Sequence, residues 1–143
     1  MTFPEYPSYE NLVGTFATIL LKVDDNDYQG DSRLLLTDGF RFGLLFFGWG
    51  SCSGCDALQS AQDDGERALR ELRDDLANKT HWEDNAAALA AYIEGKDWSL
   101  DLGGGSVADA AFRARTLEIL RDLAAGRTDA ATVETAATKQ IGR

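Results

Sequence analysis

The chain has 143 residues, of which 44% are hydrophobic, 27% are charged and two are proline. A chain of this length can form one domain with a sizeable core, and its composition excludes a disordered, collagen-like or disulfide-scaffold protein. No apolar run reaches the length of about 18 residues that a membrane-spanning helix needs. The first residues lack the basic and apolar regions of a secretory signal. We therefore expect an intracellular protein without a membrane partner.

The net charge is −10, and the charge is unevenly distributed along the chain. Residues 1–102 hold 19 acidic and 8 basic residues, hence −11, whereas residues 103–143 hold 5 and 6, hence +1. An acidic field of this size opposes direct binding to nucleic acid and favours a basic protein partner, a cation or simple solubility. The change of sign and the three glycines at 103–105 predict an acidic α+β domain over 1–102 and a helical C-terminal extension over 103–143.

The first half of the chain predicts strands. Residues 13–23 are rich in β-branched and aromatic side chains, which are typical of a strand, and a polar turn follows at 24–27. Asp38 and Gly39 separate the apolar segments 32–37 and 40–47, and Asp-Gly is typical of the type I′ turn of a β-hairpin. Because the segment after Arg41 is almost wholly apolar, we expect helices to cover both of its faces.

The second half predicts helices. The clearest pattern places Leu69, Leu72 and Leu76 on one helical face, with charged pairs four residues apart on the other. The predicted helices cover residues 56–61, 66–77, 83–94 and 106–124, with a weaker helical segment at 128–140. The expected fold is therefore α+β: a small antiparallel sheet around a β-hairpin, covered by helices, with a helical C-terminal appendage.

Cys52 and Cys55 form a Cys-x-x-Cys pair just before a predicted helix. A helix N-terminus lowers the pKa of a thiol, which favours dithiol redox chemistry, although no proline follows that could supply a cis peptide bond. The pair is also half of a tetrahedral zinc site, to which His81 could add a third ligand, although the spacing is unusual. The third interpretation, which we favour, is a structural turn whose thiols are inert.

In that interpretation the glycine-rich segment 48–55 is a tight turn around Trp49. We expect Gly48, Gly50 and Gly54 to occupy positions with positive φ or close packing, because glycine tolerates both. Replacing any of them with alanine should then cost more than the change in propensity alone.

Three stretches form a distinctive pattern: Asp-Tyr-Gln-Gly-Asp at 27–31, the Asp38–Gly39 hairpin, and Gly-Trp-Gly-Ser-Cys-Ser-Gly-Cys-Asp-Ala-Leu-Gln at 48–59. In these stretches the chain resembles a group of small, uncharacterised bacteriophage-encoded proteins, over roughly residues 27–100. The resemblance implies a phage accessory protein that acts in the host cytoplasm. Because the group has no established activity, the resemblance assigns no catalytic residue.

The sequence thus favours a non-enzymatic accessory protein that binds a basic host or phage macromolecule through an acidic surface, such as an inhibitor of a nucleic-acid-binding or defence protein. The candidate contact residues are Asp24, Asp25, Asp27 and Asp31. The alternative is a thiol-redox or zinc-binding protein centred on Cys52 and Cys55, zinc being the one cofactor considered. Association into a homo-oligomer stays open.

Overall fold

The computed structural model describes residues 7–24, 30–49, 56–96 and 107–141. Within these ranges, four strands form one antiparallel sheet in the order β1-β2-β3-β4. The strands are β1 (Thr18–Asp24), β2 (Gly30–Thr37), β3 (Phe42–Trp49) and β4 (His81–Glu83). The helices are α1 (Tyr9–Val13), α2 (Ala57–Asp64), α3 (Glu66–Lys79), α4 (Ala86–Gly95), α6 (Val107–Ala124) and α7 (Ala130–Ile141). The predicted α+β fold with a helical C-terminal part is confirmed.

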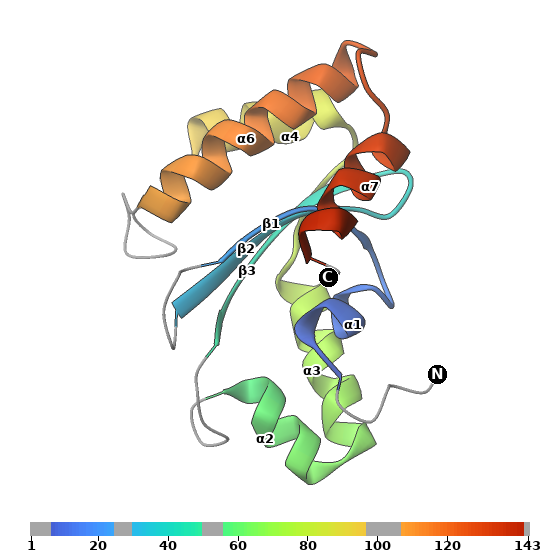
Figure 1. The fold of residues 1–143 in the computed structure, drawn as a ribbon, viewed down its shortest axis with the longest axis vertical. Helices are drawn as coiled ribbons and strands as arrows, with labels where there is room; N and C mark the ends of the chain where they lie inside the picture. The colour runs from blue at the N-terminus through green and yellow to red at the C-terminus, as the bar shows by residue number, and fades with distance from the viewer. Residues whose placement is uncertain (1–6, 25–29, 50–55, 97–106, 142–143) are drawn as a thin grey trace.

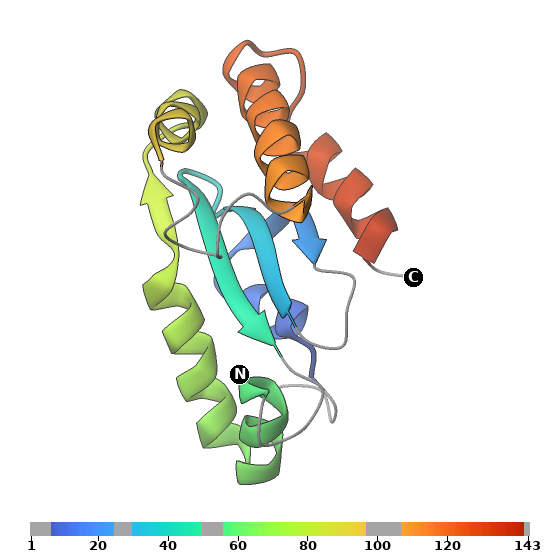
Figure 2. The same cartoon turned by 90° about the vertical axis from the view of Figure 1, so that its left-hand side faces the viewer.

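The sheet lies between two groups of helices (Figures 1 and 2). On one face, termed the α1 face, Leu34, Leu36 and Leu45 pack with α1, α2 and α3. On the other, termed the α6 face, Leu35 and Leu44 pack with α4 and α6, and α7 packs along β1. Because side chains alternate between the faces of a strand, helices on both sides bury three consecutive leucines of β2. The prediction that helices cover both faces of the segment after Arg41 is correct, because Leu44 and Leu45 of β3 pack on opposite faces.

The β2–β3 hairpin is present, but its turn differs from the predicted one. The strand pairing leaves four residues, 38–41, in the connection. Gly39 has a φ of 96°, whereas Asp38 does not have a positive φ, so a type I′ turn, which needs two positive φ values, is excluded. Instead, the Asp38 carboxylate accepts hydrogen bonds from the backbone N–H groups of Phe40 (2.9 Å) and Arg41 (2.6 Å) and fixes a wider turn.

Two short elements occupy places where the sequence predicts something else. Helix α1 ends at Val13, the first residue of the predicted strand 13–23, and the strand itself begins only at Thr18. The helix starts where it does because the Ser8 side chain accepts the backbone N–H of Asn11 (3.1 Å) in a capping box. Strand β4 precedes the predicted helix 83–94. That helix begins at Ala86, where the Asn85 side chain caps it.

Strand β1 contains a β-bulge. Its pairing with β2 shifts between Ile19 and Leu21, which leaves Leu20 as the extra residue. Leu20 and Leu21 both join the core on the α6 face, as expected of two residues opposite one partner. Beyond the bulge, Lys22 and Asp24 lie on the α1 face, beside the first helix. The bulge therefore brings polar side chains to the α1 face at the end of a largely apolar strand.

Helix α6 completes the core on the α6 face. Phe112 and Leu120 are fully buried and belong to the cluster that contains Leu35 of the central strand. The predicted boundary between residues 1–102 and 103–143 therefore does not coincide with a break in the hydrophobic core. The glycines at 103–105, on which that boundary depended, lie outside the described residues. None of the described helices is long and apolar enough to cross a membrane.

Candidate functional site

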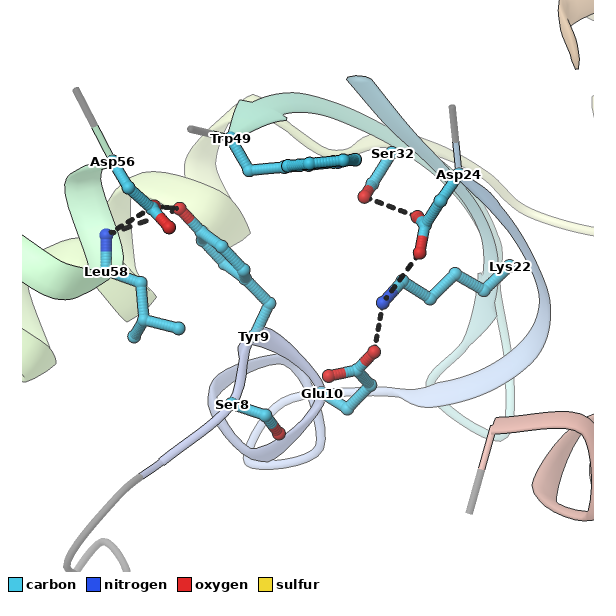
Figure 3. A pocket seen from close by; sticks show the side chains of 9 residues that line it. All are labelled: Ser8, Tyr9, Glu10, Lys22, Asp24, Ser32, Trp49, Asp56 and Leu58. Atoms are coloured by element: carbon cyan, nitrogen blue, oxygen red, sulfur yellow. Dashed lines mark hydrogen bonds and ion pairs between the residues drawn. The ribbon is translucent and has the colours of Figure 1, made fainter. Parts of the chain in front are cut away.

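A pocket opens at the end of the sheet where β1 ends and β2 begins, between α1 and the first residues of α2 (Figure 3). Its volume is about 320 Å³. We name it the α1 pocket. Its lining residues come from the helix-capping Ser8 and from α1, the sheet and the start of α2: Ser8, Tyr9, Glu10, Lys22, Asp24, Ser32, Trp49, Asp56 and Leu58.

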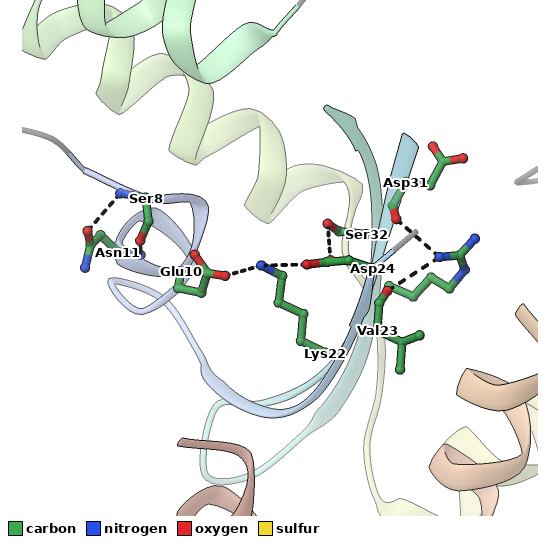
Figure 4. A network of polar contacts seen from close by, with 9 residues as sticks. Ser8, Glu10, Asn11, Lys22, Val23, Asp24, Asp31 and Ser32 are labelled. Atoms are coloured by element: carbon green, nitrogen blue, oxygen red, sulfur yellow. Dashed lines mark hydrogen bonds and ion pairs between the residues drawn. The ribbon is translucent and has the colours of Figure 1, made fainter. Parts of the chain in front are cut away.

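Lys22 is the one cation among the described residues that line the pocket. Its ammonium pairs with Glu10 and lies 3.3 Å from Oδ2 of Asp24 (Figure 4). The Ser32 hydroxyl donates to Oδ1 of Asp24 at 2.5 Å. Burial raises the pKa of the Glu10 carboxyl, but the hydrogen bond and the charge of Lys22 outweigh it, so this pKa lies below its ordinary value. Glu10 is therefore ionised at neutral pH, and Lys22 is shared between two carboxylates.

Tyr9 and Asp56 form the other side of the pocket. The Tyr9 hydroxyl donates to Oδ1 of Asp56, which also accepts the backbone N–H of Leu58 at 3.0 Å as the N-cap of α2. Burial raises the pKa of the Tyr9 hydroxyl well above its ordinary value, and the hydrogen bond to Asp56 acts in the same direction. The Tyr9 ring packs against Phe47 with 4.5 Å between centroids. A protonated Tyr9 thus holds α1 against α2 and the sheet.

Trp49, at the end of β3, contributes a second aromatic ring to the pocket (Figure 3). Its Nε1 is buried and has no hydrogen-bond acceptor among the described residues. Burying an unpaired donor costs on the order of 1–3 kcal/mol. Within the described residues, a side chain that lines the pocket thus carries a buried donor for which no acceptor is seen.

The described lining residues combine two aromatic side chains with three carboxylates and one ammonium. The formal charge of the lining is −2, from Glu10, Asp24 and Asp56 against Lys22. Carboxylates bind cations through charge-assisted hydrogen bonds, and aromatic faces attract them through the ring quadrupole. The arrangement is suited to holding a cationic group.

Of the four predicted acidic contact residues, the two that the structure describes lie on different faces of the sheet. Asp24 lines the α1 pocket and bonds to Ser32, whereas Asp31 lies across the sheet, as Figure 4 shows. Asp31 pairs with Gly48 in the β2–β3 ladder. Asp25 and Asp27 lie outside the described residues.

Helix α3, which carries four of the 24 acidic residues, is neutral as a whole. It contains four acidic and four basic side chains, so it adds nothing to the acidic excess. Four ion pairs form along it: Arg67–Glu71, Glu66–Arg70, Asp75–Lys79 and Arg73–Asp74. The carboxylates of the α1 pocket, in contrast, outnumber their cation.

The sequence groups His81 with Cys52 and Cys55 as a redox or zinc site, and both cysteines lie outside the described residues. His81 Nε2 lies 2.6 Å from a carboxylate oxygen of Glu83, and the imidazole stacks on Tyr92 with 3.7 Å between centroids. In the part of the chain that is described, no group of three or more His, Cys, Asp or Glu side chains could hold a metal ion. The side-chain contacts of His81 that the structure shows are thus with β4 and α4, and its backbone pairs with Leu44 of β3.

The structure corrects the prediction for Gly48. This residue and Trp49 are the last two of β3 and do not form a turn. Gly48 does not have a positive φ, and an added Cβ would lie 3.5 Å from Oδ1 of Asp31, which is an ordinary contact. Gly50 and Gly54, the other glycines of the predicted turn, lie outside the described residues.

Sequence reasoning missed most of the residues of the α1 pocket. The sequence does single out Lys22, because it is the only basic residue among the first 32. It does not single out Tyr9 and Asp56, since their hydrogen bond joins positions 47 residues apart.

Comparisons with known proteins leave the family of the chain open. No family model matches it, and no curated protein or solved structure shows significant similarity to it. The resemblance to phage proteins therefore stays an expectation, and the function is inferred from the geometry of the site.

Proposed function

We propose that the protein is a non-enzymatic accessory protein, of the phage type that its sequence resembles, and that it binds a basic host or phage protein through the acidic end of its sheet. The observation that carries this proposal is the α1 pocket. Its lining holds three carboxylates and one ammonium, and the side chain of Asp24 is 41% exposed.

The charge distribution supports a basic partner. Helix α3 is neutral, whereas Asp24 lines a pocket of net negative charge and is followed in the sequence by two further acids, Asp25 and Asp27. Complementary fields accelerate association and reject partners of like charge, which disfavours nucleic acid. The competing explanation is that these carboxylates only keep the protein soluble, which would not depend on where they lie.

Binding of an oligo-arginine peptide separates these explanations, with the neutral oligo-citrulline peptide as a control. The test variant carries Asp24→Lys, Asp25→Lys and Asp27→Lys. The matched control carries Asp63→Lys, Asp64→Lys and Asp84→Lys, which make the same change of charge at three exposed positions elsewhere. Association rates are measured at about 50 mM and about 300 mM salt, where screening differs strongly.

We expect the first variant to slow association at least about tenfold at low salt, because steering depends on local charge. The control should retain most of the rate, and thermal melts should show that both variants remain folded at the temperature of the binding measurement. If both variants lose the same amount, only net charge matters and the proposal fails. Binding that is indifferent to salt and to both sets of reversals contradicts it as well.

A further inference from the structure

We infer that the α1 pocket takes one arginine side chain of the basic partner, and that Lys22 is an internal cation with which this arginine competes. The inference rests on the proposed function, because it specifies the contact made at the acidic end of the sheet. It specifies the chemical group that the pocket binds, the guanidinium of arginine, and the residue that limits the affinity, Lys22.

The lining of the pocket matches a guanidinium group. Carboxylates from α1 and β1, Glu10 and Asp24, lie on one side, and the rings of Tyr9 and Trp49 lie on the other (Figure 3). A guanidinium is planar, weakly hydrated and rich in donors, so it stacks on aromatic rings while it bonds to carboxylates. A volume of about 320 Å³ is at the small end of the range for ligand pockets and suits one side chain.

Trp49 supplies a second, independent observation. Its indole N–H is buried without an acceptor among the described residues, and such groups are uncommon in native proteins. Violations of local rules that cost stability concentrate at functional sites. An occupant that repacks this wall would change the surroundings of the indole, so its N–H resonance reports on the pocket.

Lys22 already occupies the position that an incoming cation needs. Its side chain is 13% exposed, and its ammonium sits between Glu10 and Asp24. Replacing Lys22 with methionine keeps an unbranched apolar stem and frees both carboxylates. A matched control is Lys79→Met, which removes one positive charge from an ion pair with Asp75 on α3.

The probe is an acetylated and amidated Gly-Arg-Gly tripeptide, compared with its citrulline and lysine counterparts. The readout is the indole N–H resonance of Trp49 in the ¹⁵N–¹H spectrum of the full chain, assigned with a Trp49→Phe variant. We expect a saturable shift with arginine, a weaker affinity with lysine and no saturable shift with citrulline. Lys22→Met should bind arginine about three- to tenfold tighter, whereas Lys79→Met should stay within about twofold of the parent.

Three results would overturn the inference. These are no saturable shift with arginine, equal binding of citrulline, and an affinity of Lys22→Met no higher than that of Lys79→Met. Should Lys22→Met unfold, Glu10→Gln decides instead: it must weaken arginine binding at least about threefold, and an unchanged affinity rejects the inference. If oligo-arginine binds in a way that depends on salt and Asp24 while the tripeptide leaves Trp49 unchanged, the acidic surface stands and the arginine pocket fails. If neither peptide binds, both proposals fail.

Discussion

Arg33 of β2 and Asp109 of α6 form an ion pair whose side chains are only 1% and 3% exposed, although 76 residues separate them in the chain. The guanidinium also donates to the backbone carbonyl of Asp31 at 3.2 Å. A buried charge is costly unless it is paired and hydrogen-bonded. The pair therefore favours one way of docking α6 on the sheet over others that leave the guanidinium unpaired.

Asp109→Leu should destabilise the protein by about 3–5 kcal/mol, because it leaves the Arg33 guanidinium buried without this carboxylate. The double variant Arg33→Met with Asp109→Leu should recover most of that loss, since well-packed apolar side chains often replace a buried ion pair at little cost. Urea unfolding of the parent and the two variants measures both effects. A loss of less than about 1 kcal/mol in the single variant would show that the pair contributes little.

A protein that ends at residue 102 should not fold cooperatively. It lacks Phe112, Ile119 and Leu120, which are all buried in the core on the α6 face. Burying each such side chain contributes about 1.5–3 kcal/mol, and a typical domain is stable by only about 5–15 kcal/mol. NMR dispersion and a urea transition test this expectation. A cooperative transition at the parent midpoint would instead support a separable C-terminal extension, as the charge pattern predicts.

Gly43→Ala should destabilise the sheet, whereas Gly48→Ala in the same strand should not. A Cβ at Gly43 would lie 2.9 Å from both Cγ2 of Thr80 and Cε3 of Trp82, so these side chains must shift. Overpacking of this kind costs about 1–3 kcal/mol. At Gly48 the new Cβ makes an ordinary contact, and the change should stay within about 0.5 kcal/mol. Thermal melts of both variants provide the measurement, and similar melting temperatures would contradict the prediction.

Asp38 should give the β2–β3 turn a pH-dependent stability. The backbone N–H of Arg41 is the main cause that lowers the pKa of this carboxyl from 3.8 to about 2, helped by the N–H of Phe40 and the Arg41 guanidinium and opposed by burial. Because the folded pKa is the lower one, the stabilisation is complete above about pH 3.8 and is lost as the pH falls through 2. Asp38→Asn should therefore melt below the parent at pH 7, and the gap should close between pH 4 and 2.

Melting curves across this pH range provide the measurement. Asp63→Asn, at an exposed position on α2, serves as the control. A gap between Asp38→Asn and the parent that stays constant down to pH 2 would assign the stabilisation to something other than the charge of Asp38.

The sequence predicts elements whose signal is local. Helix α3 follows from the spacing of Leu69 and Leu76, which are both buried, and the hairpin follows from two apolar segments around a turn. The type of turn does not follow, because the side-chain hydrogen bonds of Asp38 decide it. Strand β4 has three residues and forms only by pairing with β3, a contact that no local pattern reveals.

The candidate site is predictable only in part for the same reason. Asp24 is found from the density of charge around it. Glu10 and Asp56 are distant from Asp24 in the sequence and meet in one pocket only because α1 and α2 pack on the same face of the sheet. A pocket built by tertiary packing leaves no spacing rule in the sequence.

The bulge in β1 means that this strand contains one residue, Leu20, that its pairing with β2 does not need. Without Leu20, the pairing of Ile19 and Leu21 with β2 becomes continuous, and Lys22 still faces α1. The loss of one codon here costs a buried leucine but leaves the pocket in place. The same loss inside β2, whose pairing with β3 is regular, turns every later side chain of the strand to the opposite face. The chain should therefore tolerate the loss of residue 20 without relocating the α1 pocket.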